Sequence, residues 1–224
     1  MRHASGFTLV ELAIALAIVG LLLGMLIVPL NAQVDQQRIN DTQKQLNLTS
    51  EALMGFAVAT GRLPCPASPT VANSVAGAGL EVKPGATCTL TEGVVPWTTL
   101  GVNETDAWGR RFTYRVTPAF ADDPAGGLQA SFTLADTGSI TITNGAANIA
   151  TNIAAVIVSH GKNGAGAYQP DGTRLAVNAG DEGENTDADN TFVSRINAPD
   201  FDDLLAWVAP TMLKSRMVAA NRLP

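Results

Sequence analysis

Residues 6–30 read GFTLVELAIALAIVGLLLGMLIVPL, and Glu11 is the one ionisable side chain in residues 7–30. At a helical rise of about 1.5 Å per residue, a segment of this length covers the roughly 30 Å hydrocarbon core of a bilayer. Membrane helices tolerate glycine and a late proline such as Pro29. The sequence therefore predicts a transmembrane helix over residues 7–30.

Glu11 stands near the start of this apolar run. A carboxylate inside a membrane segment costs about 3 kcal/mol on insertion scales, so such a residue indicates function. Arg2 precedes the run, and the positive-inside rule then places the N-terminus in the cytoplasm and the rest of the chain outside.

Two simpler interpretations of the N-terminus stay open at this point. A secretory signal peptide is one, with a passable cleavage site at Leu30-Asn31-Ala32, although its apolar region is usually about 7–15 residues long. A plain signal anchor is the other.

The composition fits one apolar helix and one exported domain. The chain has 224 residues, is rich in glycine, and carries a formal net charge of −6. Nucleic-acid binding usually requires a basic face, and the Arg110–Arg111 pair and the C-terminal cations offer little of one. We therefore expect no nucleic-acid partner.

Cys65 and Cys88 lie in a segment rich in proline and glycine. Neither has a second cysteine or a histidine at metal-binding spacing, which argues against zinc. Export favours a disulfide between them over two unrelated buried thiols, and closing that loop is worth about 3 kcal/mol in the chain-entropy model.

Residues 31–60 are polar but keep a helical pattern. Ile39, Leu46 and Leu53 recur every seven residues and form a narrow apolar stripe, with Thr42, Thr49 and Phe56 on or beside it. We expect the membrane helix to continue outward to residue 60 and to end at Gly61 and Pro64.

The remaining residues, 61–224, predict a globular head of the α+β class. Four segments have strand patterns, and they are residues 111–116, 130–135, 139–143 and 154–159. A turn at residues 136–138 predicts a hairpin over 130–143, and together the strands predict an antiparallel sheet of about four strands. Asp200 is a candidate N-cap for a helix over 200–208, and residues 211–221 predict a second short helix.

The residues Gly6-Phe-Thr-Leu-Val-Glu11 resemble the prepilin peptidase recognition motif of type IV pilins and type II secretion pseudopilins. The resemblance implies that residues 1–6 are a leader, cleaved between Gly6 and Phe7, and that Phe7 is then N-methylated. It also implies that the Glu11 carboxylate neutralises the N-terminal amine of a neighbouring subunit. The implied fold is a long N-terminal helix packed on an antiparallel sheet.

The same resemblance implies a structural subunit and not an enzyme. Its partners would be prepilin peptidase, other pilin or pseudopilin subunits and an inner-membrane assembly platform. It would cross the inner membrane once, with a periplasmic head, before entering a periplasmic or surface filament. The alternative is a signal-anchored periplasmic enzyme or binding module that does not polymerise.

Two segments of the head resemble the major pseudopilin. Asp106-Ala-Trp-Gly109 is similar to its Asp-Pro-Trp-Gly motif, with Ala107 in place of proline. The acidic residues 181–190 are similar to its calcium loop, and carboxylates suit Ca²⁺. Asp187 and Asp189 are the first candidate ligands, followed by Glu184 and Asp181. The alternative is a solvated acidic loop.

His160 follows Ser159, but no catalytic motif accompanies the pair. We interpret His160 as a structural residue at the end of a strand.

Overall fold

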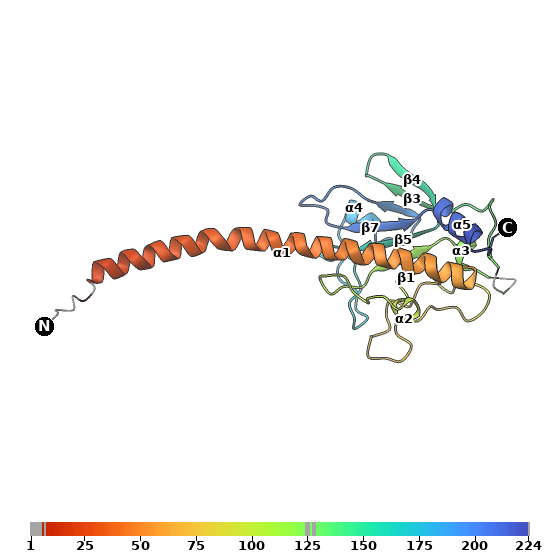
Figure 1. The fold of residues 1–224 in the computed structure, drawn as a ribbon, viewed down its shortest axis with the longest axis horizontal. Coiled ribbons are helices and arrows are strands. Elements are labelled where there is room, and N and C mark those ends of the chain that lie inside the picture. The colour runs from red at the N-terminus through yellow and green to blue at the C-terminus, as the bar shows by residue number, and fades with distance from the viewer. Residues whose placement is uncertain (1–5, 7, 124–125, 127–128, 224) are drawn as a thin grey trace. The chain divides into compact units, whose positions relative to one another are not determined.

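The computed structural model describes residues 6, 8–123, 126 and 129–223, with the backbone but not the side chains of residues 23–30. The chain divides into two compact units, residues 1–40 and residues 41–224. Helix α1 (Leu9–Thr60) contributes to both units (Figure 1). It ends where Gly61 adopts a positive φ of 87°, in agreement with the predicted stop.

The other elements belong to the unit of residues 41–224. In chain order they are β1 (Glu92–Val94), α2 (Trp97–Leu100), β2 (Thr113–Val116), α3 (Pro118–Ala121), β3 (Ile140–Thr143), β4 (Asn148–Ile153), β5 (Ala155–Ser159), α4 (Asp181–Glu184), β6 (Thr191–Val193), β7 (Leu204–Val208) and α5 (Pro210–Ala219). This order confirms the α+β class.

A four-stranded antiparallel sheet forms the centre of this unit, with the strand order β1-β2-β5-β7. Tyr114 of β2 lies opposite Ile157 of β5, which in turn lies opposite Ala206 of β7. Every residue of β5 is buried. A strand buried on both faces is a continuous apolar run, which is the pattern that predicted it.

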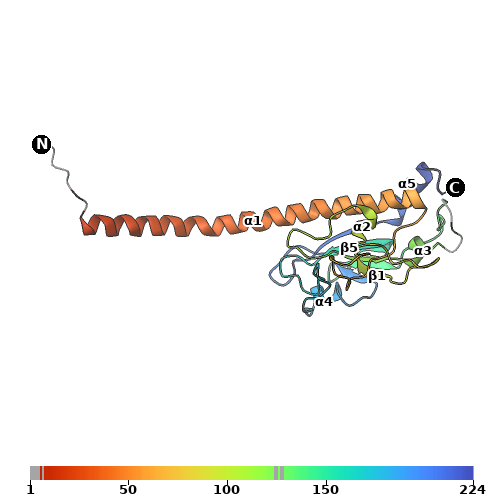
Figure 2. The same cartoon turned by 90° about the horizontal axis from the view of Figure 1, so that it is seen from below.

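Two different layers cover the two faces of this sheet. Side chains alternate along a strand, so Ala155 and Ile157 face one core and Val156 and Val158 the other. The first core includes Leu46 and Leu53 of α1, and Figure 2 shows residues 41–60 of α1 along one side of the sheet, with α4 on the opposite side. The second core lies against a three-stranded sheet of order β4-β3-β6.

The apolar stripe predicted on α1 is confirmed within residues 41–60. Leu46, Leu53, Thr42 and Thr49 are all buried. The Thr42 hydroxyl also accepts a hydrogen bond from the N–H of Ala107, at 3.3 Å.

The strand predicted over 130–135, and with it the hairpin over 130–143, is wrong. The strand β3 pairs antiparallel with β4 and parallel with β6. In the earlier segment the Asp136 carboxylate accepts the backbone N–H of Thr133, and Phe132 packs on the Phe120 ring at 4.9 Å. Because the Asp136 side chain takes the N–H of Thr133 in this turn, that N–H is not available to pair with a neighbouring strand.

The helix predicted over 200–208 is also wrong, because residues 204–208 form the edge strand β7 along β5. The Asp200 carboxylate binds the Arg195 guanidinium at 2.8 Å and caps no helix. Pairing with a buried strand overrides the local helical pattern. The second C-terminal helix is confirmed as α5, which starts at Pro210.

Cys65 and Cys88 form the predicted disulfide. Within the same segment, both Nη atoms of Arg62 donate to the Glu81 carboxylate at 2.8 Å, and that carboxylate also accepts the N–H of Cys65 at 3.0 Å. A covalent bridge and a two-pronged ion pair therefore hold the extended segment that follows α1.

Leu53→Ala is expected to lower the free energy of unfolding by about 2–5 kcal/mol, because it leaves a cavity between α1 and the sheet. Leu53 is 0% exposed, whereas Leu48 on the same helix is 66% exposed. Leu48→Ala is the matched control and should change stability by less than about 0.5 kcal/mol. Denaturant unfolding of the full chain in detergent, followed by tryptophan fluorescence, measures both, and equal effects would contradict the packing described.

The double variant Cys65→Ser with Cys88→Ser is expected to lower the free energy of unfolding by about 3 kcal/mol, because the unfolded chain gains conformational entropy when the loop is no longer closed. The same unfolding measurement, with the wild-type chain before and after reduction as the reference, tests this value. A double variant as stable as the oxidised wild type would show that the bridge contributes nothing.

Candidate functional site

Thr8 and Glu11 close the first turn of α1 by a reciprocal set of hydrogen bonds. The backbone N–H and the hydroxyl of Thr8 both donate to Glu11 Oε2 at 2.9 Å. In return the N–H of Glu11 donates to the Thr8 hydroxyl oxygen at 3.3 Å. This is the capping-box arrangement, and it satisfies N–H groups that the first turn of a helix leaves without partners.

The sequence contained the signal for this cap, since Thr8-Leu-Val-Glu11 has the spacing of a capping box. We predicted only a role for Glu11 between chains. Gly6 lies exposed ahead of the helix, and Phe7, the other predicted processing residue, lies outside the described residues.

The part of α1 that follows the cap is apolar on every side. Its exposed side chains include Leu9, at 87%, together with Val10, Leu12, Ile14, Leu16, Ile18, Val19, Leu21 and Leu22. A helix that is hydrophobic all round is normally buried in a core or a membrane.

Within the described part of the chain, no helix has an apolar stretch long enough to cross a membrane. The segment predicted to do so, residues 7–30, includes Phe7 and the side chains of residues 23–30, which lie outside the described residues.

These features occupy the segment that a protein family shares. Residues 1–27 match the family model of the prokaryotic N-terminal methylation motif. The chain carries this motif. The methylation motif is the signature of type IV pilins and pseudopilins, and it includes Gly6, Thr8 and Glu11.

The match ends at residue 27, so the methylation motif says nothing of the sheets or of the segments between them. Comparison of the chain with curated proteins and with solved structures gave no match. The specific likeness of the head to the major pseudopilin is not confirmed.

The acidic residues predicted to bind calcium separate into two sets. Glu184, Asp187 and Asp189 each have a carboxylate oxygen within 4.8 Å of the others. Asp181 is not in this group, because its carboxylate binds the Arg195 guanidinium at 2.6 Å. Asp187 and Asp189 are exposed, and partial burial together with their charges raises the pKa of Glu184.

A second group of carboxylates lies deeper, where Glu182, Asp202 and Asp203 come within 4.8 Å of one another. Glu182 comes from α4, and the two aspartates directly precede β7. Sequence reasoning missed this group because it assigned both aspartates to the first turn of a helix. The signal available was an Asp-Asp pair at the start of an apolar segment.

Burial dominates the electrostatics of this second group. It raises the pKa of Asp203 to about 8, and the charges of Glu182 and Asp202 act in the same direction. Burial also lowers the pKa of His160 to about 3. The 3.9 Å approach of His160 Nδ1 to Asp203 Oδ1 is therefore not an ion pair at neutral pH.

His160 directly follows β5, as predicted for a residue at a strand end. Its Nε2 lies 2.8 Å from the Thr113 hydroxyl. The neighbouring Ser159 hydroxyl donates instead to Asp106 Oδ2 at 2.7 Å. The adjacent serine and histidine therefore have separate partners and do not form a nucleophile–base pair.

Asp106 organises the Asp-Ala-Trp-Gly turn. Its Oδ1 accepts the N–H groups of Trp108 and Arg110 at 2.9 and 3.0 Å. The Arg110 side chain donates to the carbonyls of Gly161 and Lys162, at 2.7 and 2.9 Å. The motif thus links the start of β2 to the turn that follows β5.

Arg111 is fully buried. It donates to Glu104 Oε1 at 2.9 Å and, also at 2.9 Å, to the carbonyls of Pro69, Val71 and Pro170. Its guanidinium is therefore a structural centre for three loops.

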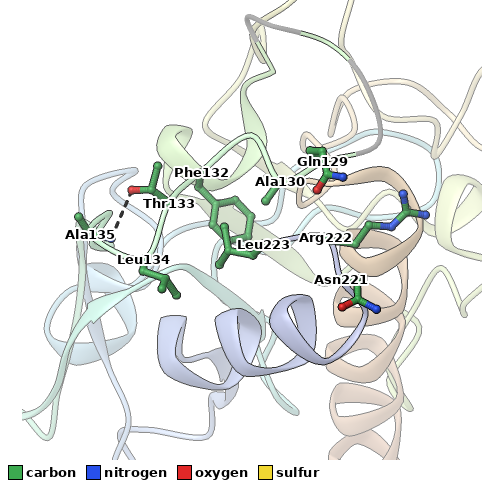
Figure 3. Close-up of a pocket in the computed structure, with 9 residues that line it drawn as sticks. All are labelled: Gln129, Ala130, Phe132, Thr133, Leu134, Ala135, Asn221, Arg222 and Leu223. Atoms are coloured by element: carbon green, nitrogen blue, oxygen red, sulfur yellow. Dashed lines mark hydrogen bonds between the residues drawn. The ribbon is translucent and has the colours of Figure 1, made fainter.

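A hollow of about 780 Å³ lies beside the end of α5 (Figure 3). Residues 129–130 and 132–135 line it on one side and residues 221–223 on the other. Figure 3 shows the Phe132 ring and the Leu223 side chain together near its centre. The lining is mainly apolar and brings together no set of catalytic groups.

Arg111→Ala is expected to lower the free energy of unfolding by at least about 3 kcal/mol, because it leaves buried carbonyls without a hydrogen-bond donor. Arg216→Ala is the matched control, because Arg216 forms an exposed ion pair with Glu51 at 2.7 Å. The control should lose less than about 1 kcal/mol. Unfolding of the two variants under one condition tests the difference, and similar losses would disprove a special role for the buried guanidinium.

Proposed function

We propose that this protein is a structural subunit of a type IV pilus or a type II secretion pseudopilus. The observation that carries the proposal is the methylation motif at residues 1–27, placed directly before and within an apolar helix. The role is structural and not enzymatic.

In this proposal prepilin peptidase cleaves after Gly6, where a small residue leaves the backbone accessible. The new N-terminal residue, Phe7, is then N-methylated. An α-amino group titrates near pH 8, so the new terminus remains largely cationic at neutral pH. The cut therefore creates a positive charge close to the start of α1.

Glu11 supplies the opposite charge for a neighbouring subunit. A buried charge is tolerated when it is paired, and removing one partner costs about 3–5 kcal/mol. This cost fixes the position of each subunit relative to its neighbours, because a subunit fits only where its carboxylate meets an amine. Once helices pack side by side, the exposed apolar side chains of α1 are covered as well.

The same side chains support a place in the inner membrane before assembly, with the N-terminus in the cytoplasm and residues 61–224 in the periplasm. The Cys65–Cys88 disulfide suits that oxidising compartment. The partners are prepilin peptidase, other pilin or pseudopilin subunits and an inner-membrane assembly platform.

A signal-anchored protein that does not polymerise is the competing candidate. It also explains an apolar N-terminal helix, and the Thr8 cap gives the Glu11 carboxylate a role within its own chain. It gives no reason, however, for the match to the methylation motif.

Glu11→Val is expected to be inserted, cleaved and methylated normally but to enter filaments at least about tenfold less than the wild type, since the neighbouring amine loses its partner. Immunoblots of sheared filaments and mass spectrometry of the N-terminus measure the two steps separately. A missing cleavage after Gly6 in the wild type would disprove the processing step.

Thr8→Val is the matched control, because it removes the hydroxyl from the cap and keeps the Glu11 carboxylate. We expect this variant to assemble close to the wild-type level. Normal assembly of Glu11→Val, or an equal defect in both variants, would contradict the pairing role.

A further inference from the structure

Strand β7 connects two opposite ends of the head. Its first residue lies opposite Ser159 of β5, and its last residue lies opposite Ala155. The segment before β7 and helix α5 after it are therefore separated by the length of the strand. Helix α4 belongs to the first end, because Glu182 accepts the N–H of Asp202 at 3.1 Å. Figure 1 shows α4 and α5 toward opposite ends of this sheet.

The first end carries an exposed isoleucine. Ile196 is 89% exposed, as much as Leu9 of the apolar N-terminal helix at 87%. The loop that presents it is held by Arg195, whose guanidinium binds Asp181 at 2.6 Å and Asp200 at 2.8 Å. Single exposed apolar side chains are common on protein surfaces, so Ile196 becomes informative only together with a surface that fits it.

The second end has such a surface, in the hollow beside α5 (Figure 3). Phe132 and Leu223 are buried and form its apolar floor, and Leu134 is 58% exposed at its edge. The ammonium group of Lys214 donates to the carbonyl of Leu134 at 2.9 Å and also to that of Asp136. The hollow therefore has an apolar floor and a cation at its edge, and it is large enough for an isoleucine side chain.

The first end is acidic. Residues 181–185 and 194–203 contain six acidic side chains and one basic one. The neighbouring residues Arg110 and Lys162 add two cations. Even with Asp203 protonated at neutral pH, as its pKa of about 8 implies, this end keeps a net negative charge.

The second end is basic. Residues 209–224 contain three basic side chains and no acidic one. Glu51 forms an ion pair with one of the three, and Asp136 is adjacent to another. The net charge of this end remains positive, so the two ends of the head carry charges of opposite sign and attract one another.

We propose that a second copy of this chain docks end to end on the first, with its Ile196 inserted into the hollow formed by Phe132, Leu134 and Leu223. The opposite charges orient the two heads, and burial of the isoleucine stabilises the contact. This inference rests on the proposed function and adds a contact between heads to it. A projection at one end that fits a hollow at the other end makes a heterologous contact, which repeats without closing and builds a fibre.

Disulfide cross-linking of the full chain tests the contact, in membranes and sheared filaments treated with copper phenanthroline. The double variant Leu134→Cys with Ile196→Cys should give bands of two, three and more chains on a non-reducing gel. Val75→Cys with Leu134→Cys is the matched control, because Val75 is 54% exposed but lies at neither end. We expect at least about tenfold less cross-linked product from the control, since its cysteines lie outside disulfide distance. Equal yields, or no ladder from the test pair, would overturn the proposal.

The single variants show whether the contact joins different surfaces. Ile196→Cys alone and Leu134→Cys alone should not cross-link, whereas a mixture of the two chains should give a dimer that extends no further. A dimer from either single variant would indicate a symmetric contact and overturn the end-to-end arrangement. Both substituted side chains are exposed, so each variant should unfold within about 2 °C of the wild type.

Salt tests the contribution of charge. Raising NaCl from about 50 mM to about 500 mM before oxidation should lower the ladder yield at least about threefold, because exposed charges are screened. An unchanged yield would overturn the orienting role of the opposite charges.

The same samples separate this contact from the proposed function. Wild-type chain that is cleaved after Gly6 and present in sheared filaments, with no ladder from the double variant, would overturn the contact and leave the proposed function standing. A ladder in membranes from a chain that is never cleaved and forms no filaments would retain the contact and overturn the proposed function.

Discussion

Strand β5 is buried along its whole length, and this burial determines where the other elements of the head lie. A strand with two apolar faces needs a cover on each. Residues 41–60 of α1 provide one cover, through Leu46 and Leu53. The β4-β3-β6 sheet provides the other, through side chains such as Ile142 and Phe192. The end of β5 then carries Ser159 and His160 into the polar interior beside Asp203.

Local patterns predicted those elements whose environment repeats with a simple period. For this reason the predictions were correct for the stripe on α1, the run at 154–159 and the strand at 139–143. Predictions from local patterns were wrong where a tertiary contact decided the structure. Residues 204–208 look helical in isolation, yet they become the edge of the sheet because β5 offers them a ladder.

The candidate sites also differ in whether their residues are close together in the sequence or are brought together by the fold. The motif at Gly6–Glu11 is local, so its residues were found from sequence, although its capping geometry was overlooked. Calcium ligands were predicted from one acidic stretch, and three of those four do come together. The buried group joins Glu182 to Asp202 and Asp203, which are distant in sequence. No spacing rule anticipates a pairing that depends on how α4 meets the start of β7.

The Thr8 cap has a consequence for how a subunit would join a filament. It gives Glu11 two donors within its own chain. A neighbouring amine that takes this carboxylate would exchange one set of bonds for another, and only the difference between them would favour assembly. An exchange of this kind keeps the net gain at each step small, so a subunit that left the filament would recover its own cap instead of exposing a bare charge. Growth and disassembly would then be separated by a modest free-energy difference, which suits a fibre that is built and taken apart repeatedly.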